Sequence, residues 1–223
     1  MMADQTIARV GPVRTDAYYD VFQMLTGVGL VAFMWMHMIL VASVNLDLGG
    51  GRVMNLIAHF FEVTYMAQLG GPMIALVMIA HFALAARKLP FRAREQKAMW
   101  DHTVRLNHLD TWMWIVQATT AFVILIMGSI HIWTVLTNLP ITAAKSGWRI
   151  QGGWWLLFYF VLLFMIELHV GFGIYRIGVK WGWITRANRQ GIHHFENKLT
   201  MVMLAIGLIT LLTFYFLVKA QPM

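Results

Sequence analysis

Four histidines of this 223-residue chain lie inside long apolar stretches of the sequence. They are His37, His81, His131 and His169. An ionisable residue inside a membrane-spanning helix costs roughly 2.5–3.5 kcal/mol on insertion scales, so it marks a functional site by default. A neutral imidazole is also a common metal ligand. The chemistry available to these residues is therefore the binding of a metal or a metal-containing cofactor within a bilayer.

The four histidines fall into two pairs when each is placed by its depth in its apolar stretch. His37 and His131 lie roughly 12–15 Å before the ends of their stretches, at 1.5 Å per helical residue. His81 and His169 lie roughly 10 Å before the ends of theirs. Successive spans cross a bilayer in opposite directions, so each pair belongs to one leaflet. Two imidazoles at one depth on two facing helices suit bis-histidine ligation of haem, and the two layers predict two stacked b-type haems.

Glycines beside two of the histidines agree with a flat cofactor. Gly128 precedes His131 by three residues, and Gly173 follows His169 by four, so each glycine shares a helix face with its histidine. A planar macrocycle needs such gaps between helices.

Two other interpretations of the histidines stay open from the residues alone. A membrane histidine can hydrogen-bond a neighbouring helix and serve packing only. A metal or proton transporter would gather its histidines and carboxylates at one depth near the midplane. Two separated layers favour electron transfer over both. Five further histidines are expected to be solvated in loops or interfacial segments: His59, His102, His108, His193 and His194.

The composition predicts that membrane helices position these residues. The chain is 59% hydrophobic and 12% charged, whereas soluble domains carry about 25% charged residues. It contains no cysteine, which excludes disulfides, thiolate-held iron–sulfur clusters and cysteine nucleophiles. We therefore expect an all-α fold, a single five-helix transmembrane bundle that encloses the two haems and forms one domain over residues 1–223.

The apolar runs and the residues that end them predict the helices. A polar leader over residues 1–20 precedes the first span, Gly70-Gly71-Pro72 breaks the chain before the second, and the last span is expected to serve packing alone. Residues 88–110 and 180–198 are expected to be polar connectors. The predicted spans are 21–45, 72–86, 110–137, 153–179 and 199–218, with a short outer helix over 54–66.

Basic residues are unequally divided between the two sides of this bundle. Of 17 Lys and Arg, the four on one side are Arg52, Lys145, Arg149 and Lys219, which leaves thirteen on the other. Cytoplasmic loops carry such an excess, so the N-terminus is predicted to be cytoplasmic and the C-terminus periplasmic. The same rule explains the net charge of +7 without a nucleic-acid partner.

Several motifs resemble those of one known family, the cytochrome b subunits of menaquinol:fumarate reductases, of the single-chain, five-helix, two-haem type shared with some succinate:menaquinone reductases. The motifs are Phe61-Glu62, Ala80-His81-Phe82, Trp114-Ile-Val-Gln117, Gly128-Ser-Ile-His131, Glu167-Leu-His169, Tyr175-Arg176 and Val179-Lys-Trp-Gly-Trp183.

The resemblance implies a role for each site residue. His37 and His131 would bind the iron of a distal haem near the outer side, and the second histidine pair would bind that of a proximal haem near the cytoplasm. Glu62 would accept the proton released by quinol, and Glu167 would relay protons across the membrane. The expected contacts of the haem propionates are Gln23, Trp114, Arg149 and Lys180.

The resemblance also implies the function and partners. The chain would be the membrane anchor that oxidises menaquinol in anaerobic respiration and passes electrons through two b haems to an iron–sulfur subunit and an FAD-containing flavoprotein that reduces fumarate. These partners would lie on the cytoplasmic side of a bacterial inner membrane, and dimerisation of the complex is left open. The alternatives are a succinate:menaquinone reductase subunit, or the cytochrome b subunit of a hydrogenase or formate dehydrogenase.

Overall fold

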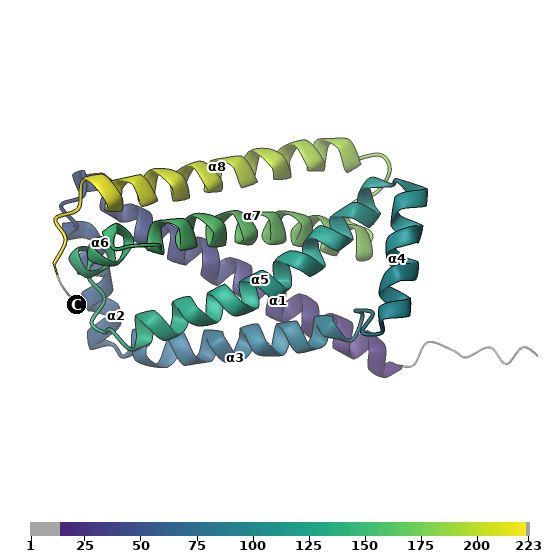
Figure 1. Ribbon diagram of the computed structural model, residues 1–223, viewed down its shortest axis with the longest axis horizontal. Coiled ribbons are helices and arrows are strands. Elements are labelled where there is room, and N and C mark those ends of the chain that lie inside the picture. The colour runs from purple at the N-terminus through teal and green to yellow at the C-terminus, as the bar shows by residue number, and fades with distance from the viewer. Residues whose placement is uncertain (1–13, 222–223) are drawn as a thin grey trace, which may run out of the picture.

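Five long helices form an elongated bundle in the computed structural model, which describes residues 14–221 (Figure 1). All five are long and apolar enough to cross a membrane. The described part of the chain contains no strand, so the predicted all-α transmembrane bundle is confirmed. The long helices are α1 (Arg14–Ala42), α3 (Met66–Ala86), α5 (Leu109–Leu136), α7 (Trp155–Lys180) and α8 (Arg189–Phe216).

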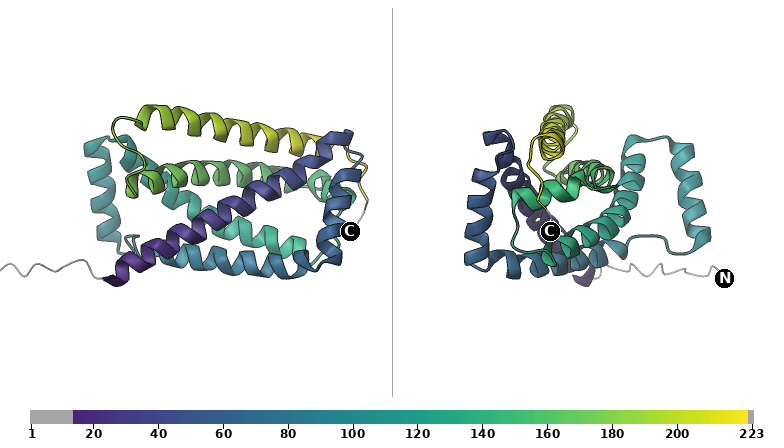
Figure 2. Two further views of the ribbon diagram at one scale, coloured as in Figure 1. Left: turned by 180° about the vertical axis from the view of Figure 1, so that it is seen from behind. Right: turned by 60° about the vertical axis from the view of Figure 1, so that its left-hand side comes forward.

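Short helices cover the two ends of the bundle. Helix α4 (Ala93–Leu106) lies across the end at which α1 begins, and we call this the α4 end (Figures 1 and 2). The opposite end, the α2–α6 end, carries a 3₁₀-helix (Ser43–Asp47), α2 (Arg52–Val63) and α6 (Ala143–Gln151). The described chain therefore begins at the α4 end and finishes at the α2–α6 end.

Two helix starts differ from the predicted spans near the N-terminus. Helix α1 begins at Arg14, inside the predicted polar leader, whose residues 1–13 lie outside the described part of the chain. Its first turns carry Asp16 and Asp20, which pair with Arg87 of the segment that follows α3. The break before the second span lies at Tyr65 instead of Gly70–Pro72. Tyr65 adopts a left-handed conformation, with φ of 58°, which turns the chain and places Pro72 inside α3.

The predicted connectors and the last span also differ from the structure. Residues 88–110 contain α4, and α8 begins at Arg189, ten residues before the predicted span. The early part of α8 packs on α7 and contains His193 and Glu196. His193 is therefore only partly solvated, with a side chain that is 25% exposed, and it lies in a helix instead of the predicted polar connector. The other four histidines expected in loops are exposed: His59, His102, His108 and His194.

The buried apolar core lies at the α2–α6 end. A buried apolar cluster there joins the 3₁₀-helix, α2, α6 and the end of α8. Toward the middle of the bundle the helices α1, α3, α5 and α7 diverge around a large cavity. The cluster thus closes one end of the bundle while leaving space between the long helices. Its buried members are Val44, Met54, Ala143, Ile150, Phe214 and Val218.

Candidate cofactor site

The cavity between the long helices has a volume of about 1550 Å³ and is lined mainly by apolar side chains. Pockets for one drug-sized ligand measure about 300–1,000 Å³, so this space exceeds the need of a single small molecule. All four apolar-stretch histidines line it: His37, His81, His131 and His169. The structure thus brings together four residues that are up to 132 positions apart in sequence, numbered 37 to 169.

One histidine pair lies toward the α2–α6 end. The rings of His37 on α1 and His131 on α5 have centroids 5.9 Å apart. Phe33 stacks on His37 at 5.8 Å, and Tyr159 Oη lies 3.3 Å from Nδ1 of His131. These contacts fix two rings from different helices toward each other, as the depth argument predicted.

The second pair lies toward the α4 end. His81 is near the end of α3, and His169 on α7 lies close enough to interact with it electrostatically. The Gln117 side chain donates a hydrogen bond of 3.2 Å to the backbone oxygen of His169. His37 and His131 thus lie side by side as their depths predicted, whereas the binding of haem iron by either pair stays a prediction.

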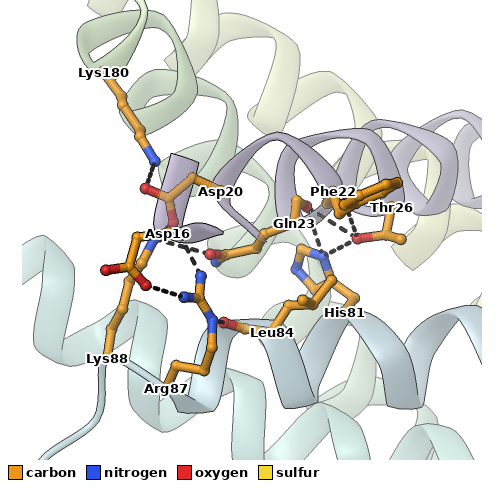
Figure 3. Close-up of polar contacts among 10 residues, drawn as sticks. All are labelled: Asp16, Asp20, Phe22, Gln23, Thr26, His81, Leu84, Arg87, Lys88 and Lys180. Carbon is orange, nitrogen blue, oxygen red and sulfur yellow. Dashed lines mark hydrogen bonds and ion pairs between the residues drawn. The ribbon is translucent and has the colours of Figure 1, made fainter. Parts of the chain in front are cut away.

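Hydrogen bonds determine which nitrogen of His81 is free. Its Nδ1 lies 3.1 Å from the carbonyl oxygen of Gln23 and 3.1 Å from Oγ1 of Thr26 (Figure 3). A carbonyl only accepts, and the Thr26 hydroxyl already donates to the Phe22 oxygen at 2.8 Å. Nδ1 must therefore donate, which leaves the Nε2 lone pair available as a metal ligand.

His169 is held in the same way from another helix. Its Nδ1 lies 3.1 Å from Oγ1 of Thr120, whose hydroxyl donates to the Val116 oxygen at 2.8 Å. Nδ1 of His169 is thus a donor, and its Nε2 is also free to bind a metal. Such a partner for the non-ligating nitrogen is typical of histidines that hold metals in proteins.

Glycines keep the surroundings of the histidines open. A β-carbon at Gly27 would come within 2.9 Å of His81 Cε1, and one at Gly173 within 3.0 Å of Gln117 Nε2. One at Gly128 would lie 3.4 Å from the Met78 sulfur. The large apolar cavity, the free Nε2 atoms of His81 and His169 and these gaps fit a planar iron cofactor with histidine ligands.

Cations and polar groups stand at both ends of the cavity. At the α2–α6 end, buried Arg149 lines the wall and approaches Tyr159. At the α4 end, Lys180 pairs with Asp20, which also binds Lys88 at 2.6 Å (Figure 3). Four residues predicted to contact propionates therefore line the cavity, while the contacts themselves stay a prediction. They are Gln23, Trp114, Arg149 and Lys180.

Glu62 lies beside the cavity on α2. Its Oε1 accepts a hydrogen bond of 2.8 Å from Gln68, and its Oε2 is buried with no hydrogen-bond partner among residues 14–221. The neighbouring Phe61 and Ala58 line the cavity wall, whereas Glu62 does not. Its role as a proton acceptor therefore stays a prediction.

Glu167 lies between the main cavity and a smaller one. It is 3% exposed and lines both spaces. Its Oε1 has no hydrogen-bond partner in the described part of the chain. The smaller space lies against α8. Glu167 is not the partner of the His169 ring, because Nδ1 of His169 is satisfied by Thr120.

Comparison with known proteins agrees with this geometry. A sequence profile of the succinate dehydrogenase/fumarate reductase transmembrane subunit matches residues 93–218. The chain belongs to this family. It is 35% identical over 204 residues to the fumarate reductase cytochrome b subunit of Helicobacter pylori, which covers 87% of this chain and 78% of the relative. It is 33% identical over 213 residues to that of Wolinella succinogenes, which covers 88% and 81%.

The comparisons confirm the resemblance inferred from the motifs, and the chain is a membrane cytochrome b subunit of the fumarate reductase type. The match supports the fumarate reductase family and gives no support to the hydrogenase or formate dehydrogenase alternative. The structure adds residues that the sequence analysis missed, namely Thr26, Thr120 and Tyr159. Their signal is weak because each lies on a different helix from the histidine that it contacts.

Proposed function

We propose that the chain oxidises menaquinol and passes the electrons to partner subunits that reduce fumarate. The observation that supports this most is the arrangement of four histidines in two pairs around one apolar cavity that spans much of the bundle. Two redox centres at different depths suit electron transfer from one face of a membrane to the other. A succinate:menaquinone reductase would use the same parts in reverse.

The histidine pairs would hold the iron of two b-type haems. His37 and His131 would bind the haem nearer the α2–α6 end, and His81 and His169 the one nearer the α4 end. When bound, the haems would carry electrons singly between the quinol and an iron–sulfur cluster. The cations at the cavity ends would bind the propionates by charge-assisted hydrogen bonds.

Two carboxyl groups would handle the protons. Glu62, at the α2–α6 end, would accept a proton as menaquinol loses its electrons, since a carboxylate within reach of a departing proton acts as a general base. Glu167 would relay protons inward across the bundle. One proton would then accompany each electron, and no charge would cross the membrane in net terms.

The partners would dock at the α4 end. The excess of basic residues there favours placing the α4 end on the cytoplasmic side of a bacterial inner membrane. The iron–sulfur subunit and the FAD-containing flavoprotein would bind against this end. This chain contains no cysteine to hold an iron–sulfur cluster by thiolates.

Purification of the chain with its partners tests the proposal. The complex should contain a flavoprotein and an iron–sulfur protein, show a reduced-minus-oxidised spectrum of b-type haem and reduce fumarate with a menaquinol analogue. A complex that contains a nickel or molybdenum enzyme, or a chain without a haem spectrum, would contradict it.

A further inference from the structure

A small cavity lies between Glu167 on α7 and Glu196 on α8. It has a volume of about 60 Å³, and a water molecule needs only about 10–15 Å³ of such space. Thr200 and Met203 are among the α8 residues that line it. The space is therefore large enough for more than one water molecule between the two carboxyl groups.

Both carboxyl groups need a partner in this cavity. Glu167 is 3% exposed and Glu196 is 7% exposed. Oε1 of Glu167 and Oε2 of Glu196 have no hydrogen-bond partner among the residues that the structure describes. Buried polar atoms in proteins are nearly always hydrogen-bonded to protein or ordered water. Water in the cavity would satisfy both oxygens and connect them.

Gly171 allows Glu196 to approach α7 closely. A β-carbon at Gly171 would lie 3.3 Å from Glu196 Oε1 and 3.0 Å from Thr200 Oγ1. Gly171 lies one helical turn beyond Glu167 in the direction of the α4 end. Glu196 is thus about one turn nearer to that end of the bundle than Glu167 is.

His193 continues the series of groups from Glu196 to the surface. Its Nδ1 lies 3.7 Å from Glu196 Oε2, and its side chain is 25% exposed. Its ring stacks on buried Tyr175 at 4.2 Å, and Tyr175 accepts a hydrogen bond from Arg189 at the start of α8. These contacts hold an imidazole between a buried carboxyl group and the solvent at the α4 end.

We propose that Glu196 and His193 carry protons between this cavity and the aqueous phase at the α4 end. Glu196 takes a proton from cavity water and passes it to the imidazole of His193, which releases it to the solvent. Each group returns to its starting state, so one proton moves and no bond other than those to hydrogen changes. A distance of 3.7 Å becomes a direct hydrogen bond after a small rotation or is bridged by one water.

This proposal rests on the proposed function, in which protons accompany electrons across the membrane. Charge balance gives a test that a mere loss of structure would not mimic. If protons cannot follow, each turnover builds a membrane potential that opposes the next. A protonophore removes that potential and should restore turnover only where the proton path is blocked.

The experiment uses the whole complex in sealed proteoliposomes, with a menaquinol analogue as donor and fumarate as acceptor. Glu196→Gln and His193→Gln should each slow turnover about 10-fold or more, in the range typical of lost acid–base groups. A protonophore should raise both rates severalfold. Glu196→Asp, which retains an exchangeable proton, should recover part of the loss. His194→Gln is the matched control, because His194 is the exposed neighbour of His193, and it should behave as the wild type.

The outcomes separate this proposal from the one on which it rests. If Glu167→Gln responds to the protonophore whereas Glu196→Gln turns over at the wild-type rate, the exit through Glu196 is contradicted and the relay at Glu167 stands. If the wild-type complex itself is stimulated, no compensating proton path exists and both are contradicted. Slow Glu196→Gln turnover without stimulation would assign this residue a structural role and overturn the proposal.

Discussion

Gly27 on α1 lies directly against the ring of His81 on α3, since a β-carbon at this glycine would come within 2.9 Å of His81 Cε1. Gly27→Ala should push the ring away from its hydrogen bonds to Gln23 and Thr26. Loss of such partners typically costs about 10–100-fold in metal affinity. We expect weaker retention of one haem, measured as haem content after purification.

Gly29→Ala supplies the control for this substitution. Gly29 lies on the same helix, and a β-carbon there would meet nothing within 4 Å. This variant should keep both haems. Equal haem content in the two variants would contradict the assignment of His81 as a ligand held by α1.

Glu62→Gln should abolish oxidation of menaquinol. Glutamine keeps the shape of the side chain and can still bond to Gln68, but it cannot accept the proton that quinol releases. Succinate-linked dye reduction by the flavoprotein should remain, because it does not use this site. Normal quinol turnover by the variant would move the oxidation site elsewhere.

Glu167→Gln should retain both haems and assembly with the partner subunits. It should still reduce fumarate with an artificial donor that delivers electrons directly to the partner subunits. Most activity with menaquinol should be lost, since glutamine cannot exchange a proton. Full menaquinol:fumarate activity would leave Glu167 with a packing role only.

The sequence predicted the long helices and the proximity of His37 and His131 for simple physical reasons. Membrane thickness sets the length of an apolar span, and the fixed helical rise converts residue number into depth. That is why His37 and His131, far apart in sequence, could be matched before their rings were seen 5.9 Å apart.

The ends of the helices and the hydrogen-bond partners of the histidines were harder to predict. Helix α8 begins with polar residues because its first turns run beyond the apolar span while still packing on Tyr175 and α7. A search for apolar residues therefore omits His193 and Glu196. The partners of the histidine Nδ1 atoms, such as Thr120, depend on the rotation of each helix, which one sequence does not reveal.

Orientation in the membrane can be measured with single cysteines, because the chain has none of its own. Glu95 on α4 and Lys219 at the opposite end are both exposed. A thiol reagent that cannot cross membranes should label Lys219→Cys in intact spheroplasts and should not label Glu95→Cys. The reverse pattern would contradict the cytoplasmic location of the α4 end.

The haem content of histidine variants tests the central claim most directly. The wild-type complex should contain two b-type haems per chain in a pyridine haemochrome assay. His37→Ala and His131→Ala should each remove one and the same haem, identified by its spectrum and midpoint potential. His81→Ala and His169→Ala should each remove the other. A wild-type chain with one haem or none, or loss of the same haem from His37→Ala and His81→Ala, would contradict the two-layer arrangement.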